Sequence, residues 1–246
     1  LAEAGVCDDD HHISTLAPEL RDLGRQRAPD VGAPHQSSAL SLNPVGAAID
    51  QASSSVLYSV AFLNMIDSGP TREALDRLIG RPAFSYGVVN NDAGLAVRKP
   101  DGSVGLVDFA YLAGKAPQPF RREWSGGQGI NIHHKFIVTD FSLASAKVFT
   151  GSSNLAPSGE SGNGDNLMMI EDSKVASAYA IEALRMFDHL HFRTLMKETF
   201  APAAPQLAPK SLSLKKPTAI SGEPAWFESS YVPGSQKEKD RRLFSS

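Results

Sequence analysis

The sequence predicts an α/β fold in which a mixed, mostly buried β-sheet is flanked by helices. Short apolar runs rich in β-branched and aromatic residues recur along the middle of the chain, as is typical of buried strands. Between these runs, apolar residues repeat every three or four positions, as on one face of a helix. At least two connections between strand-like runs have the features of hairpins, so the sheet is expected to be mixed.

Helix and strand alternate from residue 43 onwards. Apolar periodicity predicts a helix over residues 43–52 and another over 69–82, with Pro70 near its start and Gly80 at its end. Strand-like runs follow these helices and are expected at 54–63, 84–90, 94–99 and 104–109. A turn signal separates the last two runs, which indicates a hairpin.

The second half of the pattern contains three more strand-like runs, at 130–140, 146–151 and 165–172. Asp172 is a good N-cap, and a helix of several turns is expected after it. The apolar positions of this helix recur at three and four residues and are Val175, Tyr179, Ala183, Met186, Phe187 and Leu190. This helix should cover one face of the sheet.

Composition divides the chain into three parts. Residues 1–42 are polar, with a short helix expected at 14–27, and are interpreted as the end of a preceding region. Residues 43–200 form the α/β unit. Residues 201–246 combine a Pro/Lys-rich linker with a tail whose aromatic residues are expected to dock back onto the fold.

Composition also limits the function classes. A net charge of −3 argues against a generally basic nucleic-acid-binding surface, although it permits a local basic site. Cys7 is the single cysteine, which excludes a disulfide or a cysteine-based metal cluster within one chain. No apolar run is long enough to span a bilayer, and no signal peptide is visible in this chain. The compartment is left open.

The run "NIHHKFIVTD" (131–140) carries the strongest chemical signal. Side chains alternate along a strand, so His133 and Lys135 share one face while His134 and Asp140 share the other. A neutral imidazole beside an ammonium can attack and clamp a phosphoryl group. His134 and Asp140 are therefore better placed as structural residues.

The next two strands bring complementary groups to the same edge. After residues 146–151 return beside the motif strand, Ser152 and Asn154 offer neutral donors for phosphate oxygens. Asp165, at the head of the following strand, can accept a hydrogen bond from Nδ1 of His133. Such a bond fixes the tautomer and leaves Nε2 free to attack.

Together, His133, Lys135, Asp140 and the run Gly151–Ser152–Ser153–Asn154 resemble the HxK(x)4D and GSxN signature of the phospholipase D superfamily. The resemblance covers about residues 40–200. It implies a catalytic half-domain over residues 43–200 in which the motif histidine becomes a phosphohistidine, the lysine and asparagine bind phosphate, and a second motif histidine protonates the leaving group. Asp140 and Asp165 complete the expected catalytic set, with no metal and no cofactor.

Two departures from the family pattern matter. Ten residues separate Asp140 from Gly151, where the family often has about six, which indicates a longer hairpin turn because added loop length costs little free energy. In addition, only Lys135 has a histidine two positions earlier, although the family builds its site from two such motifs. The second motif is expected from a missing amino-terminal half, since the chain begins with Leu rather than Met, or else from a homodimer partner.

Three functions fit these residues. A phosphodiester hydrolase that cleaves phospholipid headgroups is preferred, because the chain is slightly acidic and lacks basic tracts. A nuclease of the same superfamily is the alternative if the assembled groove is positively charged. The third is a catalytically weak phosphate-binding or assembly module, because the chain holds a single motif.

Overall fold

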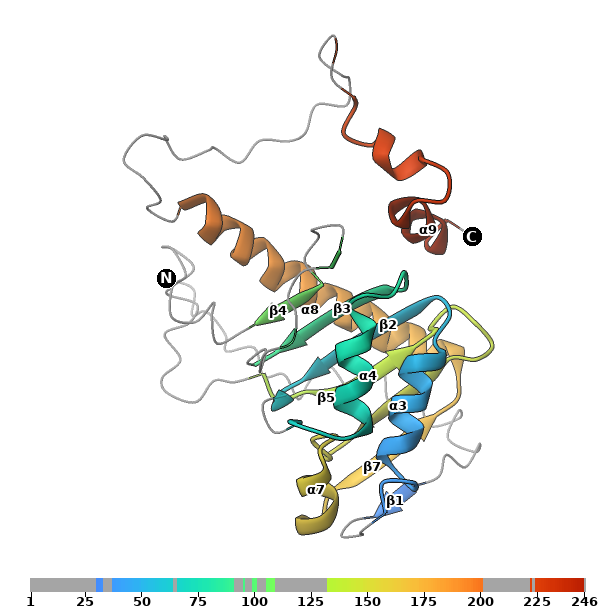
Figure 1. The fold of residues 1–246 in the computed structure, drawn as a ribbon, viewed down its shortest axis with the longest axis vertical. Coiled ribbons are helices and arrows are strands. Elements are labelled where there is room, and N and C mark those ends of the chain that lie inside the picture. Colours follow the sequence, from blue (N-terminus) through green and yellow to red (C-terminus); the bar gives the residue numbers. More distant parts are fainter. Residues whose placement is uncertain are drawn as a thin grey trace, which may run out of the picture.

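The seven-stranded sheet forms the centre of the molecule, with helices on both faces (Figure 1). The computed structural model describes residues 30–32, 37–63, 66–90, 95, 99–100, 105–108, 132–200, 222 and 224–245. The strands are β1 (Asp30–Gly32), β2 (Ser55–Val60), β3 (Phe84–Val89), β4 (Leu106–Asp108), β5 (Lys135–Thr139), β6 (Lys147–Gly151) and β7 (Asn166–Ile170). This architecture confirms the predicted fold class.

The strand order is β1-β7-β6-β5-β2-β3-β4. The pairs β2–β3 and β3–β4 are parallel, and the remaining neighbours are antiparallel, so the sheet is mixed as expected. The register pairs Val60 with Lys135 and Gly151 with Leu167. The carboxyl ends of β2 and β6 and the amino ends of β5 and β7 therefore lie at the same end of the strands.

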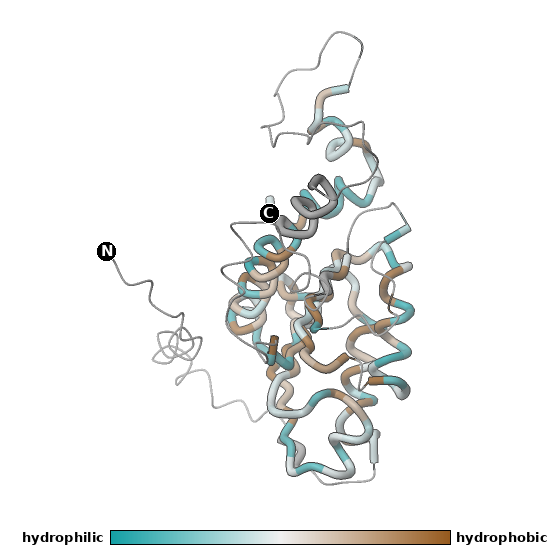
Figure 2. The backbone as a smooth tube through the Cα atoms, turned by 90° about the vertical axis from the view of Figure 1, so that its left-hand side faces the viewer, coloured by the Kyte–Doolittle hydropathy of each residue, from teal (hydrophilic) through white to brown (hydrophobic). Residues whose placement is uncertain are grey.

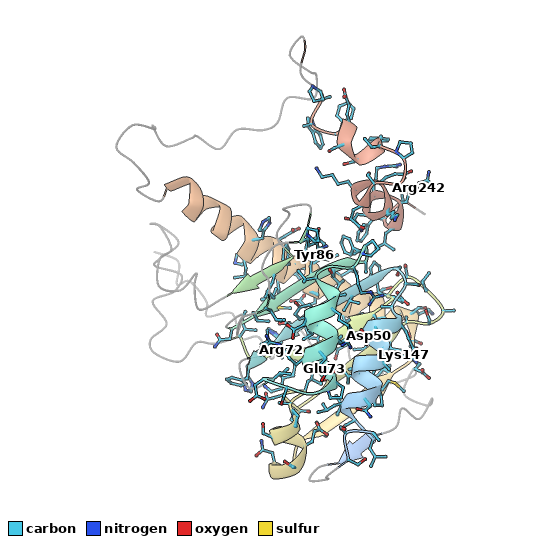
Figure 3. The ribbon with its side chains drawn as sticks, in the orientation of Figure 1. Asp50, Arg72, Glu73, Tyr86, Lys147 and Arg242 are labelled. Carbon is cyan, nitrogen blue, oxygen red and sulfur yellow. The ribbon has the colours of Figure 1, made fainter. Side chains whose placement is uncertain are left out.

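Helices α3 (Leu42–Gln51) and α4 (Pro70–Leu78) cover one face of the sheet. They approach closely at Gly46, where an added Cβ would lie 2.8 Å from the carbonyl oxygen of Pro70. Asp50 on α3, labelled in Figure 3, accepts a hydrogen bond of 2.7 Å from Arg77 on α4. Each helix turns its apolar side inward, which Figure 2 shows as brown segments facing the sheet.

The long helix α8 (Ser173–Phe200) covers the opposite face. Asp172 caps it as predicted, because its Oδ1 accepts hydrogen bonds from the backbone N–H groups of Lys174 and Val175 at 2.8 and 3.0 Å. Val175, Ala180 and Ala183 pack against the sheet. Within the described part of the chain, no helix is both long and apolar enough to cross a membrane.

The central strands are buried on both sides. On β2, Val56, Tyr58 and Val60 join the cluster under α3 and α4, whereas Leu57 joins the cluster under α8. Phe136 on β5 also faces α8. This alternation follows from the two-residue period of a strand and explains why a continuous apolar run is needed here.

The predicted helix at 43–52 is present with the same length and begins one residue earlier. The predicted helix at 69–82 and the predicted strands at 54–63, 84–90, 104–109, 130–140, 146–151 and 165–172 are present with shorter bounds. The expected helix at 14–27, strand at 94–99 and linker after residue 200 lie outside the described residues, apart from Leu95 and Lys99. The sequence did not predict β1 or the short helix α7 (Pro157–Gly162).

The C-terminal segment contains a 3-10 turn, η2 (Glu228–Tyr231), and helix α9 (Gln236–Leu243). Its main ring contacts with the sheet domain come from Phe244, whose ring centroid lies 5.2 Å from that of Phe84 and 5.9 Å from that of Phe141. Both contacts lie near the carboxyl end of β5, at the opposite end of the strands from His133 and Lys135.

Candidate active site

His133 and Lys135 lie together at the amino end of β5. The Nζ atom of Lys135 is 3.1 Å from Nε2 of His133 and donates a hydrogen bond of 3.1 Å to the His133 carbonyl oxygen. Lys135 is only 9% exposed, whereas His133 is exposed. The strand begins at Lys135, so His133 lies just outside it. The expected contact between these two side chains is confirmed.

The contact links the hydrogen-bonding role of Nε2 to the charge on Lys135. An ammonium group only donates hydrogen bonds, so a charged Lys135 requires Nε2 to accept, which corresponds to the Nδ1–H tautomer of the ring. Burial lowers the pKa of Lys135, and the negative charge of Asp165 opposes this effect. The Nε2 lone pair is thus oriented toward the group that would clamp a phosphate.

Phe62, which the sequence analysis missed, contacts both residues. Its ring meets His133 edge-on at a centroid distance of 5.5 Å, and Lys135 Nζ lies 5.3 Å from the Phe62 centroid. Phe62 follows β2, whose carboxyl end pairs with the amino end of β5. An aromatic residue near the end of the predicted strand at 54–63 was the available signal, but its use required knowing which strands are neighbours.

The turn after β6 lies beside Lys135, as the pairing of Phe136 with Thr150 requires. Gly151 has a φ of 146°, and an added Cβ there would lie 2.4 Å from the carbonyl oxygen of Asn166. Ser152 is exposed and exchanges two bonds with Asn166: its N–H donates to Oδ1 at 2.8 Å, and its Oγ accepts from the Asn166 N–H at 2.9 Å. The Ser152 hydroxyl hydrogen is left to donate elsewhere.

Asn154 is half-buried in the same turn. Its Oδ1 atom is buried and has no hydrogen-bond partner in the described structure. A buried amide atom without a partner is unfavourable by about 1–3 kcal/mol. The expected phosphate-binding role of Asn154 therefore stays a prediction.

Asp165 precedes β7 and is half-buried near the same edge. Its Oδ2 accepts a hydrogen bond of 3.4 Å from Asn163, and its charge acts on Lys135. The described structure contains no hydrogen bond between Asp165 and His133, so the expected orienting role stays a prediction.

Asp140 lies at the other end of β5 and is only 5% exposed. Its carboxylate accepts hydrogen bonds from the backbone N–H groups of Ser53, Ser54 and Ser55 at 3.0, 2.8 and 3.2 Å. Burial favours a higher pKa, but these hydrogen bonds together hold the pKa of Asp140 below its usual range. The group joins β5 to the start of β2, far from His133.

His134 does not belong to the cluster around Lys135. Its carbonyl oxygen accepts a hydrogen bond of 2.8 Å from the N–H of Ala61, and its ring lies edge-on to Phe136 at 6.3 Å. Over the residues that the structure describes, no group of three or more His, Cys, Asp or Glu side chains could hold a metal ion. The acidic and histidine-rich run at 8–12 lies outside that part.

No family model matches the chain, and no curated protein matches it. Similar solved structures include Nuc from Salmonella typhimurium, a phospholipase D family member, with 18% identity, a TM-score of 0.41, and coverage of 69% of this chain and 94% of that one. NucT from Helicobacter pylori has 16% identity, a TM-score of 0.42, and coverage of 66% and 96%. TrmBL2, an archaeal chromatin protein, has 10% identity, a TM-score of 0.34, and coverage of 73% and 60%.

Proposed function

We propose that this chain is a phosphodiester hydrolase of phospholipase D type, with His133 as its nucleophile. The observation that carries the proposal is the contact of 3.1 Å between Lys135 Nζ and His133 Nε2. It pairs a nucleophilic nitrogen with a buried cation, the combination that attack on a phosphate anion requires. The order of the HxK(x)4D and GSxN motifs along the chain supports the same class.

In the proposed reaction, Nε2 of His133 attacks phosphorus. The N–P bond forms as the P–O bond to the departing alcohol breaks, and Lys135, Ser152 and Asn154 hold the non-bridging oxygens. Asp165 would stabilise the positively charged imidazole by accepting a hydrogen bond from Nδ1. Water then attacks phosphorus, which forms a new P–O bond and breaks the N–P bond, so His133 is regenerated.

A second HxK motif is part of the proposal, because the departing alcohol needs a proton. Lys135 is the single lysine of the chain with a histidine two positions earlier. The second motif therefore comes from another half of a longer protein or from a second copy of this chain. The exposure of His133 leaves its ring accessible to such a partner.

Phospholipid headgroups are the proposed substrates, with nucleic acids as the alternative. The net charge of −3 favours a lipid phosphodiester over a long polyanion. Hydrolysis of phospholipid vesicles and of single-stranded DNA, compared under the same ionic conditions, separates the two classes.

The test of the chemistry is His133→Asn. Loss of the nucleophile should lower turnover about 1,000-fold or more, with an unchanged circular dichroism spectrum. His134→Asn is the matched control and should retain activity. Phosphorus NMR of quenched wild-type reactions should detect an N–P species that His133→Asn lacks. Full turnover by His133→Asn would refute the assignment.

The non-enzymatic alternative gives a different result. Size-exclusion chromatography and a generic phosphodiester assay are run together, with the second motif supplied where it belongs to a longer protein. Phosphate binding without hydrolysis in every assembly state would favour a binding module over the enzyme.

A further inference from the structure

A buried serine–glutamate pair lies directly behind the turn that carries Ser152 and Asn154. Ser153 is 1% exposed and Glu160, on α7, is 5% exposed. The Ser153 hydroxyl donates a hydrogen bond of 2.6 Å to Glu160 Oε1 and accepts one of 3.1 Å from the backbone N–H of Leu155. The hydroxyl therefore links the turn to α7.

We propose that Glu160 and Ser153 are positioning residues that hold the Ser152–Asn154 turn in its phosphate-binding conformation. This inference rests on the proposed function and extends it to two residues outside the expected catalytic set. Neither residue contacts His133 or Lys135 through a hydrogen bond in the described structure. They act through Ser152 and Asn154.

The backbone of the turn needs such support. Leu155 adopts a φ of 59°, which is unusual for a residue with a side chain, and it is fully buried. The Leu155 N–H is satisfied by the Ser153 hydroxyl rather than by a strand or helix. Because a strained conformation persists only where its surroundings determine it, loss of the hydroxyl or of the carboxylate frees the turn to relax.

The turn is fixed on its other side by Asn166 at the start of β7. Asn166 binds Ser152 through its side chain and accepts a hydrogen bond of 2.9 Å from the Ser153 N–H through its carbonyl oxygen. Ser152 and Asn154 are thus held between two anchors, one on β7 and one on α7. With both anchors present, these groups are preorganised for phosphate.

α7 also lies against the carboxylate near Lys135. An added Cβ at Gly159 would lie 3.4 Å from Asp165 Oδ2 and 3.9 Å from the backbone nitrogen of Asn154. Helix α7 therefore lies close to two residues of the candidate site, Asp165 and Asn154. Glu160 follows Gly159 directly. A buried carboxyl group is unfavourable unless it is well bonded, and an apolar side chain would fill the same space at lower cost. The hydrogen bond from Ser153 is one of the bonds that stabilise the buried carboxyl group.

The test compares Glu160→Ala, Glu160→Gln and Ser153→Ala. Loss of the acceptor or of the donor should raise KM and weaken the binding of inorganic phosphate by roughly tenfold, since the positions of Ser152 and Asn154 are no longer fixed. Glu160→Gln should stay within about twofold of wild type, because its amide oxygen accepts the same bond. The double variant should resemble either single variant, as expected for two members of one interaction.

Ser161→Ala is the matched control. Ser161 lies on the same helix, is exposed, and donates only to the carbonyl oxygen of Pro157, at 3.1 Å. All measurements are made well below the unfolding midpoint of every variant, so a purely structural role would leave KM and phosphate affinity of the folded fraction unchanged. If Glu160→Ala does not fold, KM and phosphate affinity are compared between Ser153→Ala, which lacks the hydrogen bond, and Glu160→Gln, which keeps it.

The two proposals fail in different ways. Hydrolysis by wild type with unchanged KM and phosphate affinity in Ser153→Ala and Glu160→Ala would overturn the positioning role and keep the enzyme. Phosphate binding that depends on Glu160, measured by titration calorimetry in a protein that hydrolyses no phosphodiester, would overturn the enzyme and keep the positioning role.

Discussion

The ammonium of Lys135 donates its hydrogen bond to the very nitrogen of His133 that is proposed to attack phosphorus, at 3.1 Å. With Lys135 charged, this bond requires the Nδ1–H tautomer of the ring and engages the Nε2 lone pair. Under the proposed mechanism, a phosphate anion would compete for the ammonium and release the lone pair when the substrate binds. The proposal therefore couples phosphate binding to activation of the nucleophile through Lys135.

Lys135→Met should abolish phosphate binding while stabilising the fold. The buried ammonium is unfavourable in the folded chain, as its lowered pKa indicates, and methionine fills a similar volume without charge. We expect a gain of about 1 kcal/mol in the free energy of unfolding at neutral pH, the usual scale of such substitutions. Urea unfolding and phosphate titration measure the two effects.

The pH dependence follows from the same shift. Because the folded chain loses the Lys135 proton more readily than the unfolded chain, wild-type stability should rise as pH increases through the lowered pKa. The amount by which the free energy of unfolding of Lys135→Met exceeds that of wild type should decrease over that pH interval. Lys147→Met is the charge-matched control; it removes a half-buried lysine at the far end of β6 together with its ion pair with Glu171 (Figure 3). A loss of stability in Lys135→Met would contradict the assignment of a burial penalty.

Phe62→Leu should lower activity by about tenfold, whereas Phe62→Tyr should retain most of it. Both substitutions keep an apolar body, but leucine removes the ring that Lys135 faces at 5.3 Å and His133 meets at 5.5 Å. The measurement is kcat and KM at fixed pH, with thermal unfolding of each variant. Equal activity in the two variants would show that only the volume of Phe62 matters.

Asp140→Asn should destabilise the protein by about 2 kcal/mol at neutral pH, since charge-assisted hydrogen bonds to three backbone N–H groups are weakened. The pKa of Asp140 is lowered in the folded state, so this stabilisation is present above the ordinary aspartate range and is lost as pH falls through the lowered value. The difference between wild type and variant in urea unfolding should therefore vanish in acid.

The control for Asp140 is Asp67→Asn, at an exposed aspartate that accepts one hydrogen bond from Ser68. It should change stability little at any pH. The folded fraction of Asp140→Asn should retain near-normal chemistry, because the carboxylate lies at the opposite end of β5 from His133. A large fall in kcat with unchanged stability would instead assign Asp140 a direct part in the reaction.

Gly151→Ala should cost about 2 kcal/mol, because its φ of 146° is unfavourable for a side chain and an added Cβ would lie 2.4 Å from the carbonyl oxygen of Asn166. Phosphate binding should weaken as well, since Ser152 follows directly. Gly164→Ala, where an added Cβ meets nothing within 4 Å, is the control. Thermal unfolding and phosphate titration of both variants measure these effects. Similar losses of stability and phosphate affinity in Gly151→Ala and Gly164→Ala would contradict the importance of the close approach between Gly151 and Asn166.

Local pattern predicted the elements of the fold with few errors. The apolar runs at 54–63 and 130–140, rich in β-branched and aromatic residues, and the cap at Asp172 were sufficient, because strand propensity and helix capping depend on neighbouring residues. The contact between His133 and Lys135 was predictable for the same reason. Edge strand β1 and helix α7 were not, since three residues carry no period and "PSGESG" has no apolar face.

By itself the sequence determined the described strands other than β1, the long helix and the order of the chemical groups along the chain. Only the tertiary structure decided that Phe62 contacts His133, that Asn166 holds Ser152, and that Glu160 bonds Ser153 behind the turn. Each of these contacts depends on which strands are neighbours and on the register that joins them, for example Val60 with Lys135. That register is set by the packing of both sheet faces against helices, which no single segment encodes.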